Sequence, residues 1–143
     1  MAAKKWTVTD HGTNTNTDVT ITPSDVGGGA KGYKITKKTL NSGLSQGVDI
    51  IHVDNGTFSF DILPTRGMSL WKAWLGKEEI GWKSPTRGPV HPAFVDMGEP
   101  GGLGWLDGFD ELMVRCGLES NGAPEHDPKT NQLIWPLHGR IGN

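Results

Sequence analysis

The sequence predicts an all-β protein, an antiparallel β-sandwich, and three observations support this class. Twenty-one glycines, about twice the ~7% average usage, and nine prolines interrupt any long helical pattern. Six tryptophans accompany them, and tryptophan is enriched in strands. The clearest segments alternate apolar and polar residues, as a half-buried strand does. Because all-β sandwiches often run to ~200–250 residues as one domain, we expect these 143 residues to form part of a larger sandwich.

The overall composition excludes several classes of protein. Fourteen Lys and Arg against sixteen Asp and Glu give a net charge of −2, which is not the basic excess of a nucleic-acid-binding protein. No apolar run approaches the ~18 residues of a membrane-spanning helix, and no apolar stretch of a signal peptide follows Lys4 and Lys5. The single cysteine excludes an internal disulfide and a cysteine-based zinc site. We expect a cytoplasmic protein with neither nucleic acid nor a membrane among its partners.

The first 47 residues carry little pattern. Thr, Asn, Asp and Gly dominate residues 7–16, and three glycines stand at 27–29, which is typical of a mobile lead-in. Within this segment, residues 19–22 predict an edge strand. The lysine-rich run 33–40 predicts a strand that faces solvent. The patterned sandwich is therefore expected over residues 48–143.

The firmest predicted element is a β-hairpin. Residues 48–53 predict its first strand, and residues 57–63 predict its second. Between them stands Asn55-Gly56, a dipeptide that type I′ turns favour because both central residues need a positive φ. The second strand has period two, with its polar residues on one face and three apolar residues on the other, namely Phe58, Phe60 and Ile62.

A second hairpin is expected after Pro64, which ends the preceding strand. Residues 68–75 and 78–82 flank a turn at Gly76-Lys77. A helix over 68–75 is the competing interpretation, since Leu, Lys and Ala all tolerate helix. Gly67 and the absence of an N-cap residue oppose the helix.

The remainder is expected to be mostly irregular. Residues 84–110 are rich in Gly and Pro yet also carry Phe94, Trp105 and Phe109, so they predict an ordered loop packed over a sheet. Residues 111–118 and 133–135 predict two further strands. In all, about seven strands are expected.

The titratable residues give no strong motif by spacing alone. None of the five histidines forms a pair with the spacing of common metal sites, so no metal is expected. A site assembled from His91, His126, His138 and Glu125 remains an alternative. There is no nucleophile elbow and no phosphate-binding loop. Cys116 is interpreted as a small buried residue rather than a nucleophile.

Four short motifs stand out when they are taken together. They are Pro-Thr-Arg-Gly-Met at 64–68, Gly-Trp-Leu-Asp-Gly-Phe-Asp at 104–110, Cys-Gly-Leu at 116–118 and Leu-His-Gly-Arg-Ile at 137–141. In this order they resemble a bacterial branch of the aldose 1-epimerase, or galactose mutarotase-like, superfamily, a branch known as a domain of unknown function. The resemblance covers about residues 48–143, and it is to the N-terminal part of the family's fold.

The resemblance implies a fold and an activity. The family fold is a large twisted antiparallel β-sandwich with a sugar-binding cleft on one sheet. Members interconvert the α and β anomers of aldoses. A carboxylate takes the proton from the anomeric hydroxyl while a histidine protonates the ring oxygen, and the ring opens and recloses without a cofactor. The expected partner is therefore a sugar or a sugar derivative.

The resemblance also assigns candidate site residues. His138 matches the histidine that contacts the sugar near its ring oxygen, and imidazole suits a catalytic proton transfer near neutral pH. Arg140 is expected on the same strand, two residues on and facing the same way, where its guanidinium would bind hydroxyls or a carboxylate. Arg66 is expected to contact sugar or to form a buried ion pair with Asp61 or Asp110.

Tryptophans complete the expected binding site. Trp105 or Trp82 would stack on a sugar face, although tryptophans in a β-protein more often belong to the core. The substrate-binding residues predicted from the sequence are Arg66, Trp105, Asp110, His138 and Arg140.

The departures from the family pattern matter equally. The family's second histidine and its catalytic glutamate lie downstream of the His-Gly motif, beyond Asn143. Neither Glu111 nor Glu119 is marked as a substitute, so no general base is assigned and this chain alone is expected to be inactive. Part of a sandwich would also expose a broad apolar face through which the chain associates.

Three other functions stay open. A non-catalytic carbohydrate-binding β-sandwich would hold a sugar without turning it over. A metal-dependent sugar isomerase would use His91, His126 and His138 and would need a stoichiometric metal. A scaffold with no small-molecule site is disfavoured by the long loop rich in Trp and Gly.

Overall fold

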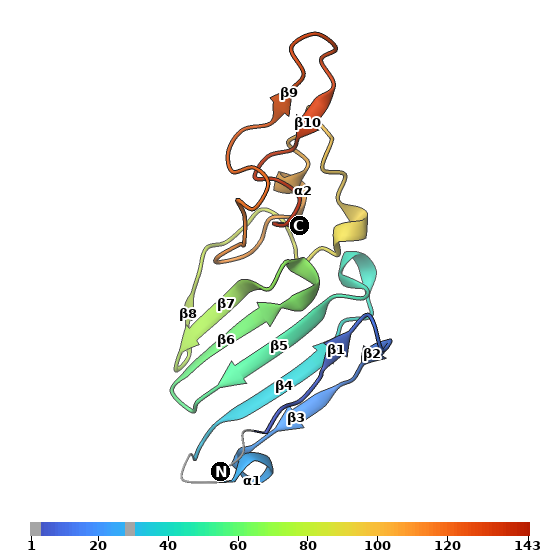
Figure 1. Cartoon of the computed structure of the whole chain (residues 1–143). Coiled ribbons are helices and arrows are strands. Elements are labelled where there is room, and N and C mark those ends of the chain that lie inside the picture. The colour runs from blue at the N-terminus through green and yellow to red at the C-terminus, as the bar shows by residue number, and fades with distance from the viewer. Residues whose placement is uncertain (1–3, 28–30) are drawn as a thin grey trace.

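A six-stranded antiparallel sheet is the main element of the computed structural model, which describes residues 4–27 and 31–143 (Figure 1). Its order is β3-β4-β5-β6-β7-β8, so each strand pairs with its neighbours in sequence. The strands are β3 (Val19–Ile21), β4 (Lys34–Thr39), β5 (Asp49–Asp54), β6 (Phe58–Leu63), β7 (Ser69–Leu75) and β8 (Glu78–Ile80). The predicted all-β antiparallel class is confirmed.

Both predicted hairpins are confirmed, but the type I′ turn expected at Asn55-Gly56 is wrong, because Asn55 does not have a positive φ. In the β5–β6 turn, the Asn55 side-chain oxygen accepts from the backbone N–H of Thr57 at 3.0 Å and of Phe58 at 2.7 Å. Gly56 has a φ of +88°, a conformation that glycine adopts without steric cost. Period-two alternation then fixes the register, because a slip by one residue would turn every side chain to the opposite face.

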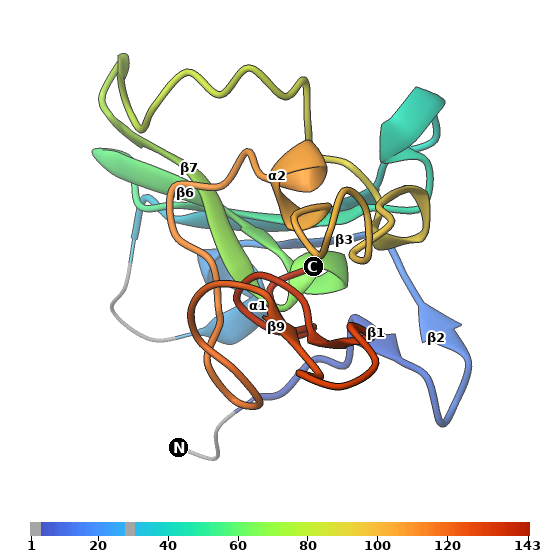
Figure 2. The same ribbon diagram turned by 90° about the horizontal axis from the view of Figure 1, so that it is seen from above.

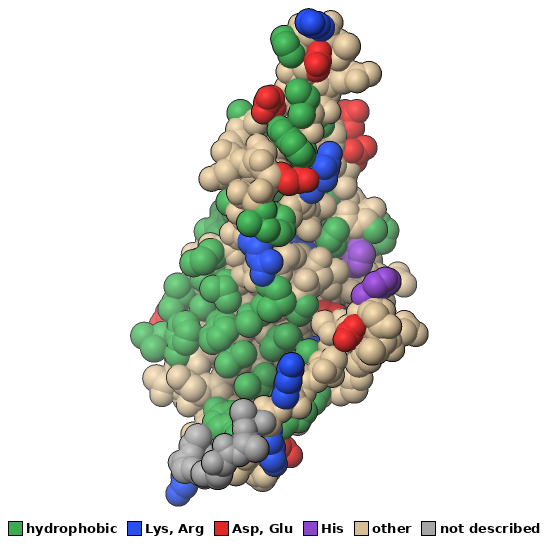
Figure 3. All heavy atoms as spheres, viewed as in Figure 1, with side chains coloured by type: hydrophobic (Ala, Val, Ile, Leu, Met, Phe, Trp, Pro, Cys, Tyr) green, Lys and Arg blue, Asp and Glu red, His purple; other side chains and the backbone are tan. Residues whose placement is uncertain are grey.

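One face of the sheet is apolar. The cross-strand register places Ile35, Val53, Phe60, Ala73 and Ile80 in a single row across five strands. Figure 3 shows apolar side chains gathered over this face, and Ile80 is 43% exposed there. We call these five residues the apolar row.

The opposite face is polar at its centre and packs a small core at one end. His52 stands opposite Asp61, and their side chains pair at 2.7 Å. At the end of the sheet Val48, Ile50 and Leu63 are buried, and Trp71 packs against them. This core supports the end of the sheet where the irregular part of the chain begins.

A β-bulge in β7 changes the direction of two side chains. Phe60 pairs with Ala73 and Ile62 pairs with Leu70, so Trp71 and Lys72 together oppose one residue of β6. A bulge of this kind bends the strand and re-aims side chains next to binding sites. Both bulge residues line the cavity described below.

Residues 81–143 form an irregular part above one end of the sheet (Figures 1 and 2). It contains only η3 (Pro92–Phe94), α2 (Trp105–Gly108), β9 (Glu125–His126) and β10 (Leu133–Trp135). The long irregular loop over 84–110 and the strand at 133–135 are therefore confirmed. Both views place the C-terminal residues beside α2, and the Trp105 Nε1–H donates to the Gly142 carbonyl at 3.1 Å.

The predicted strand at 111–118 is wrong. The segment meets the sheet at two residues: the Leu112 N–H donates to the Trp71 carbonyl at 3.0 Å, and Met113 forms an isolated bridge to Leu70. The Glu111 side chain is buried at the start of this segment. Gly117 adopts a φ of +85°, which is outside the strand region, so the backbone does not continue as a strand. Cys116 lies in this segment and is only half-buried, with its thiol 3.6 Å from the side-chain oxygen of Asn121.

The N-terminal segment is more structured than its composition suggests. β1 (Thr9–Asp10) pairs with β2 (Thr15–Asn16), and a helical turn, α1 (Pro23–Val26), follows the confirmed edge strand β3. Lys37 of β4 was expected in solvent, yet it is 2% exposed, donates to the Asn16 side chain and pairs with Asp49 at 3.0 Å. Part of the predicted mobile lead-in, residues 1–3 and 28–30, lies outside the described residues.

Two short helical turns complete the elements, η1 (Gly43–Ser45) and η2 (Pro64–Arg66). The described residues thus contain ten strands rather than about seven, and four of the ten form two short hairpins, β1–β2 and β9–β10, outside the main sheet. Within the same residues, no helix has the length and apolar character that crossing a membrane requires.

Candidate functional site

Residues within or just after three of the four motifs meet at one buried arginine. Arg66, in η2 at the end of β6, is 1% exposed, and its guanidinium forms an ion pair with the carboxylate of Glu111. Its Nη1 donates to the Val90 carbonyl at 2.9 Å and to the Asn143 side-chain oxygen at 3.1 Å. Planar guanidinium suits such multiple contacts. We call Arg66, Glu111 and Asn143 the arginine cluster.

The predicted ion-pair partners of Arg66 are wrong, because both are used elsewhere. Asp61 pairs with His52 across β5 and β6. Asp110 accepts the Trp71 Nε1–H at 2.8 Å. Glu111 lies one residue beyond the second motif, and its Oε2 accepts the Asp110 backbone N–H at 3.0 Å. Among the described residues, Arg66 Nη2 has no hydrogen-bond partner.

Trp105 and His138 pack together beside this cluster. Trp105 is 5% exposed and stacks on Phe109 with ring centroids 4.3 Å apart. The His138 ring meets Trp105 edge-on at 4.8 Å. Buried tryptophan normally finds a partner for its N–H, which here is the Gly142 carbonyl. Trp105 therefore holds the C-terminal segment and the histidine in place.

His138 and Arg140 do not share a strand, so their predicted common facing is wrong. His138 has a φ of +60° and Gly139 a φ of +72°, and the segment is a series of turns. The Arg140 side chain lies on the surface, where it pairs with Glu119 at 3.4 Å and sits over the ring of Trp135 at 5.3 Å. His138 is half-buried, and its Nδ1 is buried without a hydrogen-bond partner among the described residues.

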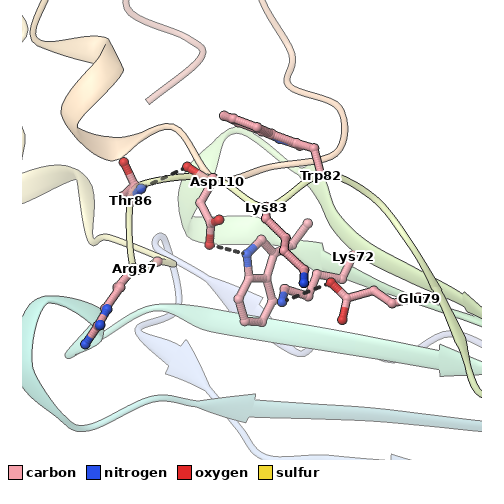
Figure 4. Close-up of a pocket in the computed structure, with 10 residues that line it drawn as sticks. Lys72, Glu79, Trp82, Lys83, Thr86, Arg87 and Asp110 are labelled. Carbon is pink, nitrogen blue, oxygen red and sulfur yellow. Dashed lines mark hydrogen bonds and ion pairs between the residues drawn. The ribbon is translucent and has the colours of Figure 1, made fainter.

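A polar cavity of about 240 Å³ opens next to the arginine cluster (Figure 4). Of the residues predicted for the site, Asp110 and the alternative stacking residue Trp82 line it, whereas Arg66, Trp105, His138 and Arg140 do not. Its wall combines two indoles with charged and hydroxyl side chains. The lining residues are Trp71, Lys72, Glu79, Trp82, Lys83, Ser84, Thr86, Arg87, Gly88 and Asp110.

The loop over residues 82–88 forms one wall of the cavity, and hydrogen bonds join it to the segment after α2. The Trp82 Nε1–H donates to the Glu111 carbonyl at 3.0 Å, and the Ser84 hydroxyl donates to the Phe109 carbonyl at 2.7 Å. Gly88 permits a close approach, because a Cβ there would lie 2.6 Å from an Asp110 carboxylate oxygen. The cavity wall and the arginine cluster are thus joined through Asp110 and Glu111.

Sequence reasoning missed several of these residues. Glu111 and Asn143 received no role, since a single carboxylate or amide outside a motif carries no local signal. Lys72, Lys83 and Arg87 all line the cavity, but the first lies in the β7 bulge and the others in the loop after β8, so no local sequence signal links them. Across residues 4–27 and 31–143, no three His, Cys, Asp or Glu side chains are grouped to hold a metal, so His91, His126 and His138 do not form the alternative ligand set.

Comparison with known proteins connects this geometry to a family. A family profile described as a domain of unknown function, DUF4432, matches residues 45–143. The crystal structure of a putative aldose 1-epimerase from Klebsiella pneumoniae superposes with a TM-score of 0.86 and 34% sequence identity. The match covers 99% of this chain and 37% of that protein. No curated protein matches the chain.

Proposed function

Because the chain belongs to the DUF4432 family, we propose that it provides the sugar-binding part of an aldose 1-epimerase-like protein that interconverts sugar anomers. The observation that carries the proposal is the 34% identical fold match over 99% of the chain. The arginine cluster and the Trp105–His138 contact bring three of the four family motifs into one place. This chain spans 37% of the matched protein, so the proposed activity is that of the full-length protein.

We assign His138 the proton transfer at the sugar ring oxygen. Its ring is held by the edge-on contact with Trp105. An imidazole can donate and accept a proton near neutral pH, as ring opening and reclosure require. Arg66 is held in place by the contacts of its Nε and Nη1, and its Nη2 has no hydrogen-bond partner among the described residues.

The test is anomer exchange measured by exchange NMR on the full-length protein with several aldoses. His138→Ala is expected to slow exchange by at least about tenfold, since a positioned general acid or base typically contributes 10²–10⁴-fold. His126→Ala is the matched control, because His126 lies in β9 and takes no part in the Trp105 contact. An unchanged exchange rate in His138→Ala would overturn the assignment of His138.

One observation favours a second candidate function, a carbohydrate-binding protein without turnover. The polar cavity next to the arginine cluster is lined by Asp110 but not by His138, so a sugar bound there would lie away from the assigned proton-transfer residue. Sugar binding by the full-length protein without acceleration of exchange would support this second function and exclude the first.

A further inference from the structure

The polar cavity beside Asp110 is lined by more cationic than anionic side chains. We propose that it is a binding site for a monosaccharide that bears an anionic group, with Lys83 as the residue that recognises the anion. The sugar part of this ligand rests on the proposed function, whereas the anionic part rests on the charges of the cavity. His138 does not line the cavity, so this site is separate from the proposed proton transfer.

The charges of the cavity leave a cationic side chain available. Lys72 pairs with Glu79 at 3.3 Å. Asp110 accepts the Trp71 Nε1–H at 2.8 Å. Among the described residues, neither Lys83 nor Arg87 forms an ion pair. The lining therefore holds three cations and two carboxylates, and the excess positive charge attracts an anion.

The position of Lys83 concentrates this charge. Figure 4 shows Lys83 reaching toward Lys72 and Glu79, whereas Arg87 extends in another direction from the same loop. Two ammonium groups thus stand near one carboxylate, and one of the two is unpaired. An ammonium group binds a phosphate or carboxylate as a point charge with three donors. Arg87 contributes at longer range to the same positive field.

The loop that carries Lys83 is ordered before any ligand arrives. Its neighbours Trp82 and Ser84 are both hydrogen-bonded to the segment after α2, at 3.0 and 2.7 Å. The Thr86 backbone N–H donates to the Ser84 hydroxyl at 3.0 Å. Ligand binding therefore costs little conformational entropy in this loop, which is the advantage of a preformed site.

The rest of the cavity suits the neutral part of a sugar. The Lys72 ammonium covers the Trp71 ring, with its Nζ 5.1 Å from the ring centroid, so the cavity presents mainly polar groups to the hydroxyls of a sugar. The Asp110 carboxylate has acceptor capacity beyond its bond to Trp71 and can accept from sugar hydroxyls. A volume of about 240 Å³ lies below the range of drug-sized ligand pockets and fits one sugar ring rather than an oligosaccharide.

The experiment is calorimetric titration of the full-length protein with glucose, glucose 6-phosphate, glucuronate and inorganic phosphate. We expect at least one of the two anionic sugars to bind about tenfold or more tightly than glucose, and the comparison between them shows whether phosphate or carboxylate is preferred. Lys83→Gln should weaken that binding by about tenfold, and Arg87→Gln by about threefold. Affinity for glucose should change little in either variant.

Lys77→Gln is the matched control, because Lys77 is an exposed lysine in the β7–β8 turn that does not line the cavity. Equal affinity for glucose and both anionic sugars would overturn the proposal. So would an equal loss in Lys77→Gln and Lys83→Gln, or the failure of every anionic probe to bind. Phosphate binding that is lost in Lys83→Gln would support the anion site even in a protein that fails to exchange anomers.

Discussion

The buried ion pair between Arg66 and Glu111 leads to a quantitative prediction. The two side chains are 0% and 1% exposed, so replacing Glu111 by Gln leaves a buried guanidinium without its counter-charge. Breaking a buried pair in this way costs about 3–5 kcal/mol of unfolding free energy.

The same substitution on the surface provides the control for this prediction. Glu119 pairs with Arg140 at 3.4 Å, but their side chains are 42% and 63% exposed. Solvent screens such a pair, and Glu119→Gln is expected to cost about 0–1 kcal/mol. Both variants are compared by urea unfolding of the full-length protein, followed by tryptophan fluorescence.

A second variant separates the ion pair from simple loss of packing. Arg66→Met combined with Glu111→Gln removes the uncompensated charge, and we expect it to recover about 1–2 kcal/mol relative to Glu111→Gln alone. A loss in Glu111→Gln no larger than that in Glu119→Gln would refute the reasoning. It would show that the arginine cluster is accessible to water.

Three further predictions concern other parts of the fold. Gly67 has a φ of +61°, and a Cβ there would overlap the Ile141 carbonyl, so Gly67→Ala should cost about 1–3 kcal/mol in urea unfolding, and a neutral effect would contradict the contact. The backbone N–H of Thr130 donates to the Asp127 carboxylate at 2.8 Å and lowers the pKa of Asp127. Its stabilising contribution is therefore present above the ordinary aspartate pKa and lost as pH falls through the lowered value, and an NMR titration with an ordinary pKa would disprove this. Phe58 is 37% exposed beside the apolar row, so the 143-residue chain alone should associate with a second copy in sedimentation experiments. Phe58→Ser should weaken that association, and a monodisperse wild-type chain would be the contrary result.

Local patterns predicted the sheet well. The Asn55-Gly56 turn and the alternation in β6 were sufficient for the first hairpin, because both depend on residues close in sequence. The ordered but irregular character of residues 84–110 also followed from composition, since Gly and Pro exclude long elements while the aromatic residues require packing. The buried state of Arg66 was one of two alternatives that the sequence left open.

The features that the sequence did not predict depend on distant contacts. Glu111 pairs with Arg66, which is 45 positions away in the sequence. This long-range contact lies at the start of the segment that was expected to be a strand. The bulge at Trp71 and Lys72 has no local signal in the sequence of β7. The buried Lys37 donates to Asn16 of the β1–β2 hairpin, which lies 21 positions earlier in the sequence. The positive φ of His138 likewise arises where its backbone N–H donates to the Gly122 carbonyl, at 3.0 Å.

The most direct test of the proposed function is the rate of anomer exchange catalysed by the unmodified full-length protein. Exchange NMR on neutral and anionic aldoses measures this rate against a protein-free sample. An aldose 1-epimerase-like protein should accelerate exchange of at least one of these sugars in proportion to protein concentration. Exchange at the protein-free rate for every sugar that binds would contradict the proposed function.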